Sequence, residues 1–109
     1  MEDGTLQGFL ELIGIPYVGS NVYASAVGQD KVFQKQIFES SDLLISKYVW
    51  FFDNEYKEDE TTILSKIKKL GYPVMVKPAR LGSSVGISKV KDENGIKEAI
   101  EDAIKYDEK

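Results

Sequence analysis

Four stretches of the chain carry hydrophobic residues at the spacing of an amphipathic helix. The first has Leu6, Phe9, Leu10 and Ile13 at positions i, i+3, i+4 and i+7, and Gly14 ends it. The same spacing predicts three further helices, at about residues 23–38, 61–70 and 93–106. The last of them has one face made of isoleucine and alanine: Ile96, Ala99, Ile100, Ala103 and Ile104. Ser20-Asn21 and Asp92 are predicted to cap helices, and Gly71 to end one.

Other segments favour β-structure. Val74–Val76 is a run of β-forming residues, and Val85–Val90 alternates apolar with small or polar residues. The connection between them is local, so these two strands are predicted to pair antiparallel as a hairpin. The aromatic stretch Ser46–Phe52 predicts a third strand, and Asp53–Glu60 is predicted to be an acidic connection.

These elements predict an α+β fold in which a small antiparallel sheet has helices packed on one face. The first helix has no preceding element to pack against. The apolar face of the last helix would ordinarily lead into another strand. We therefore expect the chain to be cut at both ends, with its sheet truncated at the C-terminal end.

Composition excludes several classes of function. The chain has 109 residues, enough for one modest domain or a piece of a larger one. It contains neither cysteine nor histidine, which excludes thiol catalysis and a Ser-His-Asp triad within it. The net charge of −4 argues against non-specific nucleic-acid binding. No stretch has the pattern of a membrane span or a signal peptide, so we expect no membrane partner and a cytoplasmic location.

The loop of the predicted hairpin carries residue types that bind phosphate. Lys77 follows the first strand, and Gly82, Ser83, Ser84 and Gly86 precede the second. Glycines allow close approach of the backbone, amides and hydroxyls donate to phosphate oxygens, and lysine adds positive charge. The lysine precedes the glycines, so this is not a Walker loop. The loop alone favours a plain tight turn. We interpret the segment as a flap over a nucleoside triphosphate because other segments of the chain agree with that function.

Four segments taken in order carry a more specific signal. They are EDGTLQG (Glu2–Gly8), GIPYVG (Gly14–Gly19), ASAVGQDK (Ala24–Lys31) and GYPVMVKPARLGSSVGISK (Gly71–Lys89). Together they resemble the D-alanine–D-alanine ligases of the ATP-grasp superfamily. The resemblance implies that residues 1–19 are the tail of an N-terminal substrate-binding domain. Residues 20–109 would then be an incomplete central ATP-grasp subdomain.

The resemblance implies an ATP-dependent ligase that acts in peptidoglycan synthesis. In that family, ATP phosphorylates the carboxylate of one D-alanine. The amine of a second D-alanine then attacks the acyl phosphate, which gives D-alanyl-D-alanine, ADP and phosphate. Such a site must neutralise phosphate charge and exclude water while the acyl phosphate exists.

The resemblance also implies roles for particular residues. The ATP-binding set would be Lys31, Lys77, Gly82, Ser83, Ser84, Val85 and Gly86. Ser84 would donate to phosphate, whereas Ser83 would be a catalytic residue in a hydrogen-bond network near the substrate. Glu2 would lie in the vicinity of the substrate site. From the residues alone, Lys31 is interpreted as a solvated helix lysine, and Arg80 and Lys89 as surface charges rather than ligands.

Cofactors and partners follow from the same resemblance: ATP, magnesium or manganese, D-alanine, and a complete enzyme that can be a homodimer. No metal ligand is predicted in this chain, because the family's metal ligands and catalytic arginine lie beyond Lys109. The acidic residues of Asp53–Glu60 lack the spacing of a metal-binding loop. Trp50 and its aromatic neighbours are interpreted as core rather than as an adenine-stacking surface. The isolated chain is expected to lack ligase activity and to bind ATP weakly.

Two alternatives stay open. A related ATP-grasp ligase that joins D-alanine to D-lactate or D-serine, or another carboxylate–amine ligase, would share these motifs. Its second substrate would be selected by segments outside this sequence. A non-catalytic α+β interaction module, in which the glycine loop is only a turn, would share the same elements.

Overall fold

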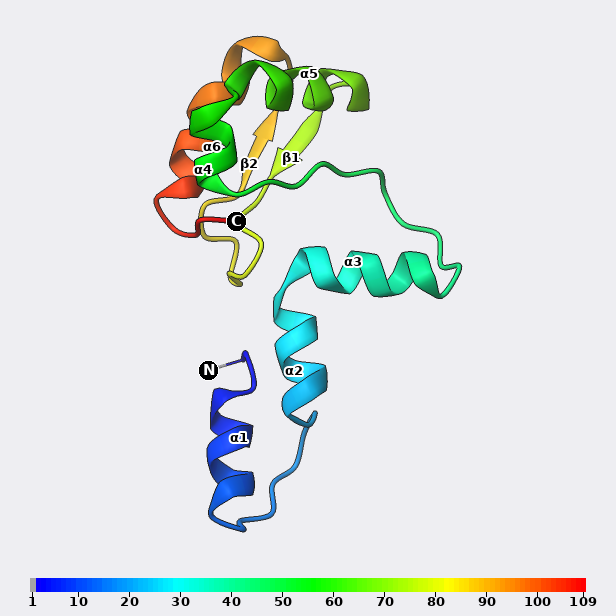
Figure 1. Cartoon of the computed structure of the whole chain (residues 1–109), viewed down its shortest axis with the longest axis vertical. Helices are drawn as coiled ribbons and strands as arrows, with labels where there is room; N and C mark the ends of the chain where they lie inside the picture. Colours follow the sequence, from blue (N-terminus) through cyan, green and yellow to red (C-terminus); the bar gives the residue numbers. More distant parts are fainter. Residues whose placement is uncertain (1) are drawn as a thin grey trace. The chain divides into compact units, whose positions relative to one another are not determined.

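The computed structural model describes residues 2–109 and divides them into two compact units, one ending at Ile45 and the other covering Ser46–Lys109. The first unit contains α1 (Thr5–Leu12), α2 (Val22–Gln29) and α3 (Lys31–Ser40) (Figure 1). The second contains α4 (Asp53–Glu58), α5 (Glu60–Leu70), β1 (Val74–Val76), β2 (Ser88–Val90), the 3-10 helix η1 (Glu93–Gly95) and α6 (Ile96–Ile104). Over the described residues, no helix has the length and apolarity to cross a membrane.

The predicted N-terminal helix is confirmed as α1, which packs against α2. Gly4 precedes it with a φ of 94°, and a Cβ at this residue would lie 2.9 Å from the carbonyl oxygen of Val22. Glycine is therefore needed where the start of α1 meets the start of α2. Asn21 caps α2 as predicted, since its side chain accepts a hydrogen bond from the Ala24 amide at 2.9 Å.

The single helix predicted for residues 23–38 is wrong, because the structure has two helices that meet at Asp30. The backbone of Asp30 is extended, with φ −88° and ψ 109°. Its buried carboxylate accepts hydrogen bonds from the amides of Val32 at 2.9 Å and Phe33 at 3.1 Å. Asp30 thus caps α3, a role in which aspartate is strongly favoured. The apolar spacing continues across Asp30 and conceals the break.

The sheet of the second unit is the predicted antiparallel hairpin. Its register pairs Val74 with Val90, Met75 with Lys89 and Val76 with Ser88. Met75 and Lys89 are exposed, whereas the valines pack toward the core. Helix α6 packs against both strands. The predicted α+β fold, with helices on one face of a small antiparallel sheet, is therefore confirmed.

The core of the second unit lies between this sheet and the helices. Its fully buried members include Ile96 and Ile100 of α6, each 1% exposed. Ile63 and Ile67 of α5 lie in the same cluster. Asp92 is a cap as predicted, because its side chain accepts a hydrogen bond from the Asn94 amide at 2.9 Å. With Ile96 and Ile100 buried in this core, α6 supports both strands of the sheet.

The predicted aromatic strand at Ser46–Phe52 is wrong, since this segment is not part of the sheet. The sheet described in the structure contains β1 and β2, which pair with each other. Val49 and Phe51 instead pack against the hydrophobic core from an irregular segment. The β-prone, aromatic composition of the segment suggested a strand, but composition does not decide whether a segment pairs in a sheet. Strand β2 is also shorter than predicted and begins at Ser88, because the residues before it form turns.

The predicted acidic connection at Asp53–Glu60 is also corrected, since its first six residues form α4. The Glu55 carboxylate accepts a hydrogen bond from the Phe52 amide at 2.7 Å, which ties the helix to the preceding residue. Asp53 pairs with Lys57 one turn later, at 2.5 Å. Acidic residues in the first turn and a lysine in the last complement the helix dipole. The acidic residues that suggested a solvated loop in the sequence thus stabilise a helix.

Candidate functional site

The candidate site is the loop that joins β1 to β2 in the second unit. Lys77 follows β1 directly and is exposed, whereas Pro78 and Ala79 after it are buried. The loop then returns to β2 through Gly82–Gly86, whose first four residues are exposed. The structure therefore presents a cation and a glycine- and serine-containing loop on one hairpin, anchored by a buried Pro-Ala pair.

The tip of this loop is a tight turn with serines in an unusual backbone conformation. Ser83 and Ser84 have φ angles of 55° and 61°, and the Val85 amide donates to the Gly82 carbonyl at 3.3 Å. Positive φ at both central residues is typical of a type I′ turn, where glycine and asparagine are the usual residues. Each serine in this region costs about 1–3 kcal/mol. The turn thus carries two exposed serines at positions where glycine would be less strained.

Gly86 closes the loop by packing against two rings. Its φ is +66°, and an added Cβ would lie 2.8 Å from Cδ2 of Tyr106 and 2.9 Å from Cγ of Pro78. Only glycine fits at such a position. The sequence indicated that this glycine lets the backbone approach a ligand. In the structure its immediate neighbours are Pro78 at the beginning of the loop and Tyr106 after α6.

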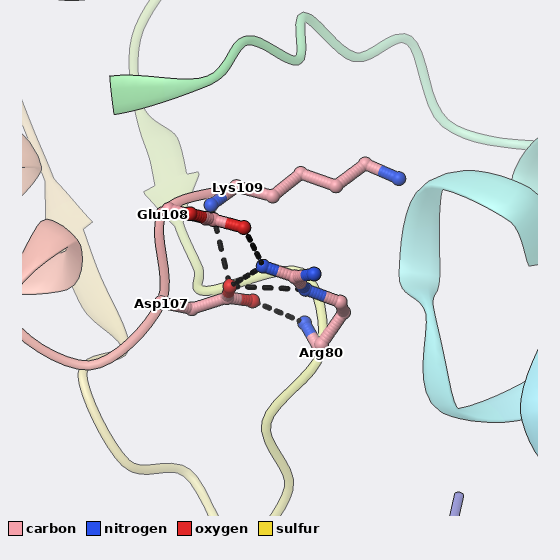
Figure 2. A network of polar contacts seen from close by, with 4 residues as sticks. All are labelled: Arg80, Asp107, Glu108 and Lys109. Carbon is pink, nitrogen blue, oxygen red and sulfur yellow. Dashed lines mark hydrogen bonds and ion pairs between the residues drawn. The ribbon is translucent and has the colours of Figure 1, made fainter. Parts of the chain in front are cut away.

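An ion-pair network holds Arg80, near the start of the loop (Figure 2). The Arg80 amide donates to Oδ2 of Asp107 at 2.7 Å. The guanidinium of Arg80 donates to Oδ1 of Asp107 from Nε at 3.0 Å and from Nη2 at 2.5 Å. A further bond runs from Nη2 to Oε1 of Glu108 at 3.1 Å. Arg80 and Asp107 are thus joined through both backbone and side chain.

This network fixes the charges of its members. Burial of the Asp107 side chain acts to raise its pKa, but hydrogen bonds from Arg80 and from the Lys109 amide outweigh burial and hold the pKa below the usual 3.8. Hydrogen bonds to Asp107 and Glu108 raise the pKa of the Arg80 guanidinium. Both groups are charged at neutral pH. Arg80 is exposed, as a surface charge would be, and the structure adds its ion pair with Asp107, which no local sequence signal could reveal across 27 positions.

Two of the predicted site residues belong to the first unit. Lys31 is the first residue of α3, half-buried and immediately after the Asp30 cap. Glu2 is exposed and precedes α1. Lys77, Ser83, Ser84 and the rest of the loop belong to the second unit. The hairpin thus brings together most of the predicted ATP-binding residues, whereas Lys31 and Glu2 are placed by other elements.

The acidic residues around α4 have structural partners. Asp59 caps α5 by accepting from the Thr62 amide at 3.1 Å, and Glu60 pairs with Lys97. Across residues 2–109, no group of three or more acidic side chains is placed to hold a metal ion. An open depression of about 430 Å³ lies beside β2 and α6, and none of the predicted site residues lines it.

Trp50 differs from its predicted core location, because it is 42% exposed. Its ring meets that of Phe52 edge-on at 5.7 Å between centroids. Nζ of Lys109 lies 5.3 Å from the Trp50 ring centroid, within cation–π range. Phe51, its neighbour, does pack on the core. The aromatic segment therefore has one side on the core and one at the surface.

The chain is similar to known proteins over most or nearly all of its length. The family model described as D-ala D-ala ligase C-terminus matches residues 37–109. A curated D-alanine–D-alanine ligase of Paenarthrobacter aurescens is 51% identical over 106 residues, which are 97% of this chain and 28% of that ligase. Another, from Natranaerobius thermophilus, is 50% identical over 109 residues, 99% of this chain and 30% of that ligase. The chain thus spans less than a third of the length of these relatives.

Solved structures give the same result. The VanG D-Ala:D-Ser ligase of Enterococcus faecalis aligns with a TM-score of 0.86 at 38% identity, over 98% of this chain and 30% of that one. The D-alanine–D-alanine ligase of Bacillus anthracis aligns with a TM-score of 0.85 at 36% identity, over 98% of this chain and 34% of that one. Both likenesses cover nearly all of this chain.

Proposed function

The chain belongs to the D-alanine–D-alanine ligase family, and from this membership we propose that it is the ATP-binding part of an ATP-dependent ligase that forms D-alanyl-D-alanine for peptidoglycan synthesis. The curated relatives are more than three times as long as this chain. The proposal therefore concerns the contribution of these residues to a complete enzyme. We expect the 109-residue chain alone to bind ATP weakly and to form no dipeptide.

One observation carries the proposal: the hairpin loop exposes two serines at positive φ beside a lysine at the end of β1. A plain turn gains nothing from serine at these positions, because glycine or asparagine would adopt them at lower cost. Retained hydroxyls are useful where hydrogen bonds to an anion are needed. The turn conformation therefore favours a phosphate-binding loop over a purely structural one.

The residues of the loop suit the triphosphate of ATP. Lys77 supplies a compact positive charge, and the exposed hydroxyl of Ser84 donates to a phosphate oxygen. Ser83 acts near the substrate as a catalytic residue, and Gly82, Val85 and Gly86 provide backbone that approaches the phosphates closely. Lys31 contributes a second cation from the start of α3. These roles neutralise charge that would otherwise oppose transfer of the γ-phosphate to the D-alanine carboxylate.

Magnesium, or manganese, is the metal that such a reaction uses to bind phosphate oxygens. Residues 2–109 bring no acidic cluster together for it, so we assign the metal ligands to other segments of the enzyme. We further propose that residues 1–19 are the tail of the N-terminal substrate-binding domain, with Glu2 near the substrate site. Residues 20–109 then belong to the central ATP-grasp subdomain. The complete enzyme would act in the cytoplasm as a homodimer.

A nucleotide titration of the 109-residue chain tests the proposal. Amide NMR shifts with millimolar MgATP should concentrate at Lys77 and Gly82–Gly86. Lys77→Ala should reduce them strongly, because the variant removes the cation next to the loop. Lys89→Ala is the matched control, since Lys89 is an exposed lysine on the other strand of the same hairpin. An absence of shifts at millimolar ATP would favour the non-catalytic interaction module.

A graft tests the reaction itself. The 109 residues replace the matching segment of a full-length relative, and D-alanine-dependent phosphate release is measured. Lys77→Ala in the graft should lower kcat/KM by roughly 100-fold or more, the magnitude typical for loss of one preorganised donor to a transition-state charge. Near-normal kinetics in that variant would refute the role of Lys77.

A second candidate differs only in the acceptor. One of the similar structures is described as a D-Ala:D-Ser ligase, so the shared fold is compatible with more than one second substrate. Product analysis of the graft cannot decide this, because its acceptor site belongs to the host. The intact enzyme that contains this sequence must be offered D-alanine, D-serine and D-lactate in turn. The dominant product identifies the acceptor.

A further inference from the structure

Both ends of the candidate loop are held by the same four residues, Tyr106–Lys109, which we call the C-terminal clamp. At the start of the loop, the Ala79 amide donates to the Lys109 carbonyl at 2.9 Å. The next amide, that of Arg80, donates to the Asp107 carboxylate. At the end of the loop, Gly86 packs against Tyr106. The exposed tip at Gly82–Val85 therefore lies between two attachments to one short segment.

The clamp is itself fixed to rigid elements of the second unit. The amides of Tyr106 and Asp107 donate to the Ala103 carbonyl in α6 at 3.1 and 3.3 Å. The Glu108 carbonyl accepts from the amide of Asp53, the first residue of α4, at 2.7 Å. Helix α6 in turn carries the most deeply buried side chains of the core. The clamp thus connects the loop to α4 and, through α6, to the hydrophobic core.

The Arg80–Asp107 pair is the critical link, because the Asp107 side chain is only 5% exposed. A buried carboxylate that loses its cation is strongly unfavourable and moves to reach water or another donor. Any such movement would release the Arg80 amide and with it the start of the loop. Lysine is not equivalent to arginine here, because two guanidinium nitrogens donate to Oδ1 of Asp107 together, whereas an ammonium has no such pair of donors in a fixed plane.

We propose that Arg80 is a positioning residue of the ligase: with Asp107 it holds the loop Gly82–Gly86 in the orientation that binds nucleotide, and it acts through the loop rather than on the phosphates. This inference rests on the proposed function for its consequence, nucleotide binding. Its structural part, control of the loop by the clamp, is independent of it. The competing explanation is that the arginine attracts ATP directly by its charge.

The two explanations differ in sign for Asp107→Asn. If Arg80 acts by charge, removing a neighbouring negative charge leaves ATP affinity unchanged or raises it. If Arg80 positions the loop, the affinity falls, because asparagine offers one acceptor oxygen where Asp107 uses two. Arg80→Lys separates the explanations again. This variant keeps the positive charge but loses the paired guanidinium donors to Asp107. If Arg80 positions the loop, MgATP binding should weaken; if Arg80 acts by its charge, binding should stay nearly normal.

The experiment uses the 109-residue chain and four variants: Arg80→Ala, Arg80→Lys, Asp107→Asn and the control Lys68→Ala. The control breaks a two-bond ion pair with Glu93 on the surface of the same unit, at 2.9 and 3.2 Å. Thermal unfolding establishes which variants are folded at the working temperature. Backbone ¹⁵N order parameters of residues 80–87 and the dissociation constant for MgATP are then measured for each.

In Arg80→Ala, Arg80→Lys and Asp107→Asn we expect order parameters in the loop to fall toward the flexible range, below about 0.6. MgATP affinity should fall by roughly tenfold, since misplacement of a binding group by about 1 Å costs up to about 100-fold. The control should match the unaltered chain. Because the lysine and asparagine variants are conservative, they keep the test decisive if Arg80→Ala does not fold.

Three results overturn the inference: tighter or unchanged ATP binding in Asp107→Asn, normal binding in Arg80→Lys, or unchanged loop order in folded variants. A different result concerns the proposed function. If the unaltered chain shows no response to MgATP while the variants still loosen the loop, the clamp is supported and nucleotide binding is not. The two failures are therefore distinguishable.

Discussion

The backbone of Gly86 lies against the ring of Tyr106 so closely that a Cβ would come within 2.8 Å of Cδ2. This contact joins the end of the loop to the residues after α6. Gly86→Ala must displace the Tyr106 ring, the Pro78 ring or the loop. We expect it to lower the free energy of unfolding by more than the roughly 1 kcal/mol typical of alanine at a positive φ. Urea unfolding measures the loss.

Gly14→Ala is the matched control for this variant. Gly14 has a similar φ of +71°, but among residues 2–109, its two chain neighbours apart, no heavy atom lies within 4 Å of an added Cβ. It should therefore show the backbone cost alone. Tyr106→Ala combined with Gly86→Ala should recover part of the excess loss. Equal destabilisation by Gly14→Ala and Gly86→Ala would show that the Tyr106 contact has no energetic weight.

Variants of Ser84 should change the free energy of unfolding and the affinity for MgATP in different ways. Ser84→Gly relieves the cost of a positive φ, so the free energy of unfolding should stay unchanged or rise by about 1 kcal/mol. The variant removes the hydroxyl, and MgATP should bind roughly tenfold more weakly because one hydrogen bond to a charged group is lost. Ser84→Ala removes the hydroxyl without relieving the backbone. Unaltered MgATP affinity in both variants would exclude a phosphate-binding hydroxyl at this position.

The Asp107 carboxylate gives the fold a predictable response to acid. Its pKa is lower in the folded chain than the usual 3.8, so folding favours the ionised form. The stabilisation is fully present above the unfolded pKa and is lost as pH falls through the folded pKa. The difference in unfolding free energy between the unaltered chain and Asp107→Asn should therefore shrink between about pH 5 and about pH 2. A difference independent of pH over this range would contradict the assignment.

Asp30 is expected to hold the junction between α2 and α3. Asp30→Ala removes the acceptor for the amides of Val32 and Phe33. Loss of an N-cap costs about 0.5–2 kcal/mol, and circular dichroism should show a loss of overall helix content. Asp30→Asn, which preserves a cap oxygen, is the matched control and should retain most of the stability. If Asp30→Ala were as stable as Asp30→Asn, the carboxylate would not be acting as a cap.

Sequence reasoning succeeded where local pattern decides the structure. The stripe of Ile96, Ala99 and Ile100 gave α6, and the Val74–Val76 run with the glycine loop gave the hairpin. Caps such as Asn21 were also recognisable, because a cap is a contact within three residues. Family membership followed from the motifs around Lys77 and the loop.

Sequence reasoning failed where contacts between residues far apart in the chain decide the structure. Ser46–Phe52 has the composition of a strand, but the structure packs Val49 and Phe51 on the core instead of pairing the segment in the sheet. Asp30 interrupts a continuous apolar spacing, so its capping role was hidden. The Arg80–Asp107 pair depends on where α6 ends in space, which the spacing of residues does not reveal. The roles of Lys31, Lys77 and Ser83 stay predictions for the titration and the graft.

The separation between Arg80 and Asp107 has a consequence for biosynthesis. Asp107 is added to the growing polypeptide 27 residues after Arg80, which takes between about 1 and 5 s at roughly 5–20 residues per second. During that interval the nascent serine turn has no Tyr106 or Asp107 to hold it. Translation therefore delivers the hairpin loop before the segment that holds it, and the loop should stay unanchored on the ribosome-bound chain until Asp107 emerges.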